Sequence, residues 1–214
     1  MYSVNEIILV SSVLLPAITG LVCYKRINPV YFPFLMLMWL GLLNEVVSLT
    51  IISLGFYNYY NFNLFHLVET LLIIWQFKNL RLFEHRTFFI LFLSTIGWFI
   101  TEAAISGLNA FYSYFYIYCA VLIVFMSMHM INKLLVTVRS NLFKNAVFLF
   151  CCAFIIFFTA SIVTEVFWVY GTQLSKEFRS GMQAIFGWSN CICNIIYAFA
   201  ILWMPRKLAF ALTY

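Results

Sequence analysis

Residues 146–169 read AVFLFCCAFIIFFTASIVTEVFWV, and Glu165 is the one charged residue among them. A helix that crosses a bilayer needs about 20 apolar residues, so this stretch is long enough to cross by itself. Six further apolar runs of helical length lie near residues 7–24, 31–54, 62–80, 87–107, 111–135 and 180–204. The sequence therefore predicts an all-α protein, in which a single domain (1–214) is a polytopic integral membrane bundle of seven transmembrane helices.

The composition excludes the soluble classes of protein. Hydrophobic residues make up 65% of the chain and charged residues 9%, whereas a soluble domain has about 45–50% and about 25%. A water-soluble enzyme or nucleic-acid-binding domain could not cover its surface with so few charges, and a disordered chain would be far less apolar. The expected surroundings are the lipid bilayer, and the net charge of +5 needs no nucleic acid to explain it.

The basic residues predict how the bundle is oriented. Ten of the twelve fall on one side of the predicted membrane: Lys25, Arg26, Lys78, Arg81, Arg86, Lys133, Arg139, Lys144, Arg206 and Lys207. The positive-inside rule places that side in the cytoplasm, so the N-terminus is expected outside and the C-terminus in the cytoplasm. No basic run precedes the first apolar segment, which argues against a cleaved signal peptide. The absence of Asn-x-Ser/Thr sequons and the heavy use of Phe, Tyr, Ile and Asn favour a multi-pass protein of a bacterial inner membrane.

Four glutamates lie inside the predicted spans, where charge is costly and usually functional. They are Glu45, Glu69, Glu102 and Glu165. No Lys or Arg lies deep in any span, and the candidate cation of the outer half is His66, one helical turn before Glu69. An isolated buried carboxylate is strongly disfavoured. Some glutamates are therefore neutral, or the site is filled with water, or a cation completes it; protonated glutamates that hydrogen-bond between helices are the structural alternative.

Polar residues recur at helical spacing on several spans. In the last span, polar or small residues at positions 183, 187, 190, 194 and 197 share one face of a helix. Polar stripes on membrane helices face the bundle interior, so we expect them to converge on one cavity. The cavity should open outward, because the cytoplasmic halves of the second, fourth and sixth spans are almost wholly apolar. The residues expected to bind a ligand or protons there are Asn44, Glu45, Asn63, His66, Glu69, Glu102, Tyr114, Tyr118, Glu165, Gln183, Asn190 and Asn194.

Motifs of known chemistry are missing from the sequence. It contains no HExxH, Gly-x-Ser-x-Gly, Gly-x-Gly-x-x-Gly or P-loop pattern, and the last span has no central lysine that could hold retinal. Cys191 and Cys193 point about 200° apart on a helix, which is unsuited to clamping a metal ion. His66 with glutamates would make a poor zinc site. We expect no cofactor, and whether a metal ion binds stays open.

Three functions stay open. The first is a ligand-sensing module that acts through a separate cytoplasmic signalling partner, because the loops are too short for a catalytic domain and the basic cytoplasmic loops suit an acidic partner. The second is a proton- or cation-coupled transporter of a small molecule, since intramembrane glutamates serve proton relays. The third is an intramembrane enzyme in which Glu69 and His66 activate a water molecule; an enzyme is the less favoured interpretation. The expected ligand is small and polar or cationic, or protons, and homo-oligomerisation stays open.

Overall fold

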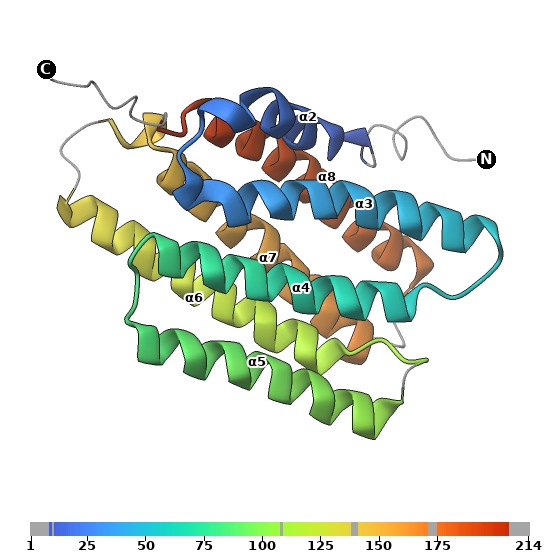
Figure 1. Ribbon diagram of the computed structural model, residues 1–214. Coiled ribbons are helices and arrows are strands. Elements are labelled where there is room, and N and C mark those ends of the chain that lie inside the picture. Colours follow the sequence, from blue (N-terminus) through green and yellow to red (C-terminus); the bar gives the residue numbers. More distant parts are fainter. Residues whose placement is uncertain (1–8, 10, 108, 138–140, 171–174, 206–214) are drawn as a thin grey trace, which may run out of the picture.

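The structure is a computed structural model that describes the chain except for residues 1–8, 10, 108, 138–140, 171–174 and 206–214 (Figure 1). The described part is all-α and contains no strand. Its α-helices are α2 (Leu14–Cys23), α3 (Phe32–Ser53), α4 (Tyr59–Asn79), α5 (His85–Ser106), α6 (Ser113–Thr137), α7 (Ala146–Tyr170) and α8 (Lys176–Leu202). Short 3-10 turns lie in three connections: η1 (Tyr24–Arg26), η2 (Pro29–Tyr31) and η3 (Leu142–Lys144).

The helices follow the predicted spans, with differences at the ends. Helix α8 begins at Lys176, before the predicted start at residue 180, because the Ser175 hydroxyl accepts a hydrogen bond from the backbone N–H of Phe178 at 3.2 Å and caps the helix. Helix α4 begins at Tyr59, earlier than the predicted residue 62. Residues 7, 8 and 10 of the predicted first span lie outside the described residues.

Within the described residues, five helical segments are long and apolar enough to cross a membrane. They are Pro29–Ser53, His85–Ser106, Ser113–Thr137, Ala146–Tyr170 and Glu177–Leu202. Helix α2 has only 10 residues, and α4 carries polar side chains along much of its length. Large apolar side chains cover the outside of the bundle, such as Phe125 and Ile105, which are 67% and 80% exposed. Such faces suit lipid better than water, so the described chain has the architecture of a helical membrane protein.

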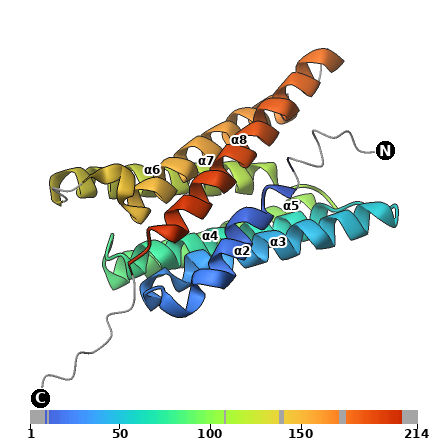
Figure 2. The ribbon, with the colours of Figure 1, turned by 90° about the horizontal axis from the view of Figure 1, so that it is seen from above.

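Six of the helices form a closed ring. Helix α2 packs on α3 and α8, α3 packs on α4, α4 on α6, α6 on α7, and α7 on α8. Helix α5 lies outside this ring, against α4 and α6 (Figures 1 and 2). Because α5 packs mainly against two neighbours, most of its surface is exposed, and its buried residues are Thr95 and Glu102. Any site in the middle of the ring is therefore built without α5.

Basic residues gather at one end of the bundle. At this end α2, α4, α6 and α8 finish and α3, α5 and α7 begin (Figure 1). Seven of the ten basic residues predicted to be cytoplasmic are described, and they lie in or beside these helix ends: Lys25, Arg26, Lys78, Arg81, Arg86, Lys133 and Lys144. Arg139, Arg206 and Lys207 lie outside the described residues. We call this the basic end.

An aromatic cluster fills the ring toward the basic end. Phe34 of α3 stacks on Phe150 of α7, with ring centroids 5.0 Å apart, and meets Tyr197 of α8 edge-on at 5.6 Å. Phe77 of α4 and Phe154 of α7 also belong to the cluster, at 6.4 Å from each other. All five rings are buried. We call these five residues the plug, because they fill the ring at the level where a through-path would run.

Gln76 of α4 fixes the start of α3 beside the plug. Its Oε1 accepts a hydrogen bond from the backbone N–H of Phe34 at 3.1 Å, and its Nε2 donates to the backbone carbonyl of Val30 at 3.2 Å. The first N–H groups of a helix have no partner within the helix. Gln76 is therefore buried in the apolar half of the bundle because the start of α3 needs a hydrogen-bond acceptor there.

Replacing Gln76 with leucine should therefore destabilise the fold. The buried Phe34 N–H would lose its acceptor, at a cost of about 2 kcal/mol in the free energy of unfolding. Thermal unfolding of the purified protein in detergent measures the effect. Thr50→Val is the control, because Thr50 is exposed and bonds only within its own helix. Equal stability of the two variants would contradict the assigned role of Gln76.

Candidate functional site

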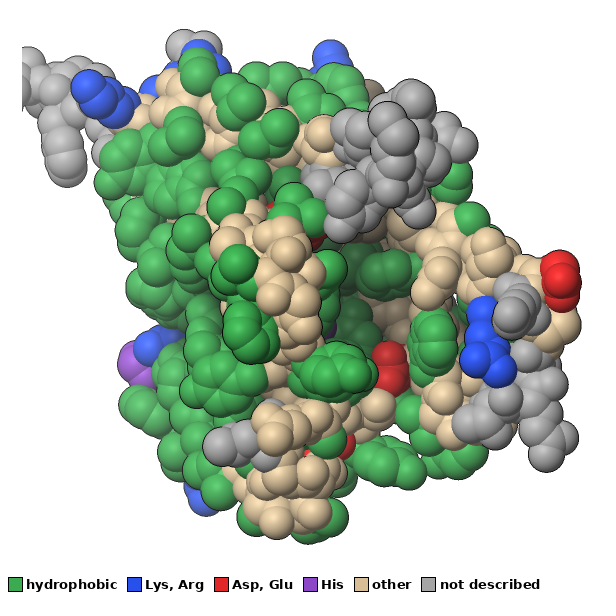
Figure 3. Space-filling model, turned by 90° about the vertical axis from the view of Figure 1, so that its right-hand side faces the viewer, with side chains coloured by type: hydrophobic (Ala, Val, Ile, Leu, Met, Phe, Trp, Pro, Cys, Tyr) green, Lys and Arg blue, Asp and Glu red, His purple; other side chains and the backbone are tan. Residues whose placement is uncertain are grey.

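A cavity of about 640 Å³ lies inside the ring, on the side of the plug away from the basic end. Its walls come from the residues before α2 and from α3, α4, α7 and α8, with Phe111 and Tyr116 added at the start of α6. Figure 3 looks at the end opposite the basic end and shows a hollow with an acidic side chain in its wall. The volume is within the range of about 300–1,000 Å³ that is typical of ligand pockets.

The cavity brings together eight of the twelve residues predicted for the site. They are Asn44, Glu45, His66, Glu69, Glu165, Gln183, Asn190 and Asn194. The stripe predicted on the last span, at positions 183, 187, 190, 194 and 197, lines the cavity along its whole length. The helical periodicity of polar residues therefore located the interior face of α8.

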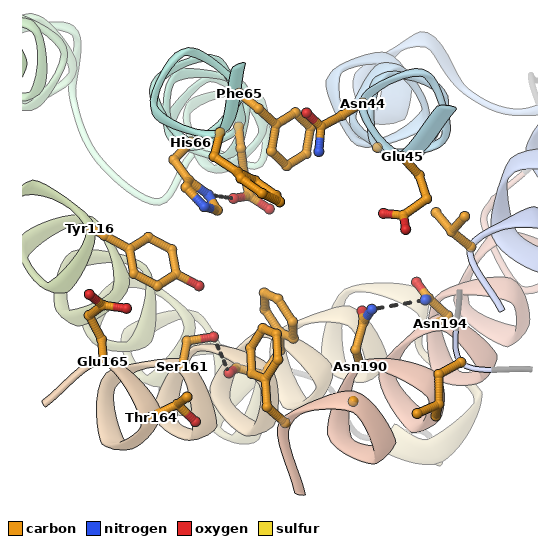
Figure 4. A pocket seen from close by; sticks show the side chains of 18 of the residues that line it. Asn44, Glu45, Phe65, His66, Tyr116, Ser161, Thr164, Glu165, Asn190 and Asn194 are labelled. Carbon is orange, nitrogen blue, oxygen red and sulfur yellow. Dashed lines mark hydrogen bonds and ion pairs between the residues drawn. The ribbon is translucent and has the colours of Figure 1, made fainter. Parts of the chain in front are cut away.

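One side of the cavity is an acidic and aromatic cluster around His66. The Nδ1 atom of His66 lies 3.0 Å from Oε2 of Glu69, and the two side chains are 14% and 12% exposed, which confirms the predicted pairing one turn apart. The His66 ring packs on Tyr116, with centroids 4.3 Å apart, and on Phe111 at 6.3 Å. Glu165 of α7 lies on the same side, below Tyr116 in Figure 4. This side therefore holds two carboxylates, one imidazole and several aromatic rings.

The other side of the cavity carries Glu45 and amide side chains. Figure 4 shows Glu45 reaching from α3 into the cavity, with Asn190 and Asn194 of α8 across from it. Asn194 Nδ2 donates to Asn190 Oδ1 at 3.4 Å and to the Ser12 hydroxyl at 2.9 Å. Asn44 Oδ1 accepts a hydrogen bond from a side-chain amide of α4. The Glu45 carboxylate makes no hydrogen bond or ion pair with any described residue, so its oxygens are free to meet a ligand.

The charges of the cavity wall do not balance. The described lining contains three carboxylates, those of Glu45, Glu69 and Glu165, and one basic side chain, His66; no Lys or Arg is among the described lining residues. Glu69 is paired with His66, which leaves two carboxylates without a cationic partner among the described residues. In the low-dielectric interior of a bundle, uncompensated charge is strongly disfavoured. The site is thus arranged to take up positive charge, as protons or as a cation.

Tyr197 lies where the cavity meets the plug. It is 7% exposed and lines the cavity, and its hydroxyl makes no hydrogen bond with a described residue. A hydroxyl at the floor of a cavity that bonds to no described residue offers an additional contact to a ligand. As to metals, no group of three His, Cys, Asp or Glu side chains in the described chain is placed to hold an ion.

The other four predicted residues lie outside the cavity, around α5 and the start of α6. Glu102 of α5 is 7% exposed, and its two carboxylate oxygens accept hydrogen bonds from the backbone N–H groups of Tyr114 and Phe115, which caps α6. Asn63 fastens the connection before α6 by accepting from the Tyr112 N–H at 3.1 Å and donating to the Ala110 carbonyl at 2.8 Å. These two residues bind the backbone of their own protein.

Two tyrosines of α6 also lie away from the cavity. Tyr118 stacks on Trp98 of α5, with centroids 5.2 Å apart, and its hydroxyl lies 3.0 Å from that of Ser94. Tyr114 is 55% exposed. The tyrosine of α6 that lines the cavity is Tyr116. Both predicted tyrosines therefore lie on faces of α6 that point away from the ring interior.

The phenylalanines of the cavity wall were not predicted from the sequence. Phe62, Phe65, Phe157 and Phe186 line the cavity. In a chain with 25 phenylalanines, these residues look like ordinary apolar packing. Spacing did contain a signal, because Phe62 and Phe65 stand one turn before His66 and Glu69 and share their helix face.

Comparison of the chain with known protein families, with curated proteins and with solved structures finds no match. A functional conclusion therefore rests on the cavity and its chemistry.

Proposed function

We propose that this protein is a ligand-sensing membrane module, which binds a small molecule in its cavity from outside the cell and acts through a separate cytoplasmic partner. The observation that carries the proposal is the one-ended cavity. It opens at the end opposite the basic end, and the plug of five aromatic side chains fills the middle of the helical ring below it. A sensor needs a binding site and a way to transmit occupancy, and does not need a path through the membrane.

The membrane topology is part of this proposal. In this proposal the chain crosses a bacterial inner membrane seven times. Five of the spans are the long apolar segments, and α2 and α4 are the other two, although their length or hydropathy alone does not identify them. The clustering of described basic residues at the plugged end supports a cytoplasmic position for that end. The same basic residues offer a surface to an acidic signalling partner.

Reporter fusions test the topology. Fusions after Arg26, Arg86 and Arg139 should report a cytoplasmic position, and fusions near Asn58 and Asn109 an external one, because the positive-inside rule orients the basic end inward. Alkaline phosphatase and green fluorescent protein, active on opposite sides of the inner membrane, give complementary readouts. Any hairpin with both of its ends on the wrong side would disprove the seven-span arrangement.

One-sided access tests the sensing function. In a membrane-impermeant thiol-labelling experiment, Asn190→Cys should react with reagent added outside, because Asn190 lines the open cavity. Val147→Cys, at the plugged end and buried, should stay unlabelled from outside. The parent chain is the background control, since its described cysteines are buried or half-buried. Labelling of Asn190→Cys from the cytoplasmic face as well would reveal alternating access and favour the transporter over the sensor.

A further inference from the structure

We infer that the ligand of this cavity is a small organic cation of the ammonium class, held between the carboxylates of Glu45 and Glu165 and the aromatic walls. The inference rests on the proposed function, because it names the ligand of the same site. Two features of the cavity carry it, its charge and its aromatic rings, and the hydroxyl of Tyr197 adds a polar contact at the floor.

The charge of the cavity selects a cation. With Glu69 paired to His66 at 3.0 Å, the carboxylates of Glu45 and Glu165 face the cavity, and the described lining residues include no Lys or Arg. Charges interact much more strongly inside a protein than in water, because the surroundings are less polarisable. An anion in this cavity would meet like charges, whereas an ammonium group would be attracted from both sides.

The aromatic rings select an organic cation over an inorganic one. Phe65, Phe111, Tyr116 and Trp168 line the cavity together with the carboxylates, and an ammonium group is attracted to the face of such rings, most strongly to tryptophan. The rings also offer apolar contact to alkyl groups. An inorganic cation such as Ca²⁺ takes six to eight oxygen ligands, and no group of three acidic or other metal-binding side chains is assembled in the described chain.

The Tyr197 hydroxyl adds a polar contact at the cavity floor. Tyr197 lines the cavity, and its hydroxyl makes no hydrogen bond with a described residue. An ammonium group with N–H donors satisfies such an oxygen directly, and a ligand long enough to reach the floor also passes the carboxylates above it.

The sign of the charge can be measured without knowing the natural ligand. We would compare how fast Asn190→Cys reacts with two methanethiosulfonates of similar size, a cationic trimethylammonium-ethyl reagent and an anionic sulfonato-ethyl reagent. Tyr57→Cys, at the exposed loop of the same end, gives the reference ratio. The cationic-to-anionic ratio at Asn190→Cys should exceed the reference by at least about tenfold. Equal ratios, or a preference for the anionic reagent, would overturn the inference.

Glutamate variants then assign this preference to the cavity. Glu45→Gln keeps the size of the side chain and should lower the ratio toward the reference, and Glu165→Gln is the second variant if the first does not assemble. Glu84→Gln removes the same charge outside the cavity and should leave the ratio unchanged. If neither Glu45→Gln nor Glu165→Gln lowers the ratio, the inference is also overturned. If neither reagent reaches Asn190→Cys in any variant, the proposed outward-open cavity itself is disproved.

Protection from labelling tests the class of ligand. Butylammonium chloride should slow the labelling of Asn190→Cys, whereas butan-1-ol and an equal ionic strength of sodium chloride should not. Trp168→Leu should weaken protection by about 3- to 30-fold. Trp188→Leu, on an exposed residue of α8 that does not line the cavity, should not. Equal protection by sodium chloride would identify a site for an inorganic cation. Equal protection by butan-1-ol would identify an apolar site. Either result would overturn the assignment of an organic cation but not the existence of the cavity.

Discussion

Replacing Glu102 with alanine is expected to lower the free energy of unfolding by about 3 kcal/mol, without changing the chemistry of the cavity. Two hydrogen bonds from backbone N–H groups to one carboxylate would be lost, and each bond to a charged group contributes about 1.5–3 kcal/mol. The N–H of Phe115 is buried, so it would stay unsatisfied. The carboxylate also sits at the positive end of the dipole of α6.

Glu84→Ala is a matched control for this prediction. Glu84 stands at the start of α5 but makes no capping hydrogen bond with its side chain, so its loss should change the stability by less than about 0.5 kcal/mol. Thermal unfolding in detergent measures both variants. At a temperature where Glu102→Ala is folded, Asn190→Cys should still prefer the cationic reagent. A stable Glu102→Ala that has lost this preference would show that Glu102 belongs to the ligand site after all.

The case of Glu102 shows where sequence reasoning stops. Residues 101–103 read Thr-Glu-Ala and residues 164–166 read Thr-Glu-Val, and both glutamates lie in apolar helices. One caps the next helix and the other lines the cavity. The difference depends on which helix end lies opposite each carboxylate, and that is a property of the packing. Asn63 lies on a helix that lines the cavity, but its side chain hydrogen-bonds to the connection before α6, for the same reason.

Other parts of the site followed directly from the sequence. The helices could be placed from apolar runs alone, because a membrane demands a minimum length of apolar chain. The stripe on α8 and the His66–Glu69 pair could be predicted because helical geometry fixes which residues share a face. The end at which the cavity closes was also predictable, since the halves of the second, fourth and sixth spans at the basic end are almost wholly apolar. The closed ring was not predictable, because the order in which helices pack is decided by side-chain fit over the whole bundle.

Replacing Phe34 with alanine is expected to open the floor of the cavity. The Phe34 ring stacks on Phe150 and meets Tyr197, which itself lines the cavity, so the space left by the ring would join the cavity from below. In a bilayer the gain from removing apolar surface from water is absent, and the cost comes mainly from lost contacts and the void. We expect about 2–3 kcal/mol in the free energy of unfolding.

Two measurements check this prediction and separate sensing from transport. Thermal unfolding should show the loss of stability in Phe34→Ala and not in Phe89→Ala, whose ring is exposed on the outer face of α5. In the Phe34→Ala background, Asn190→Cys should become reactive to reagent added from the cytoplasmic face, whereas in the parent background it should react from outside only. Cytoplasmic reactivity that is already present with an intact plug would mean that the five rings separate during normal function. The plug would then be the inner gate of a transporter, and the aromatic stacking between α3, α7 and α8 would be the contact that its working cycle breaks.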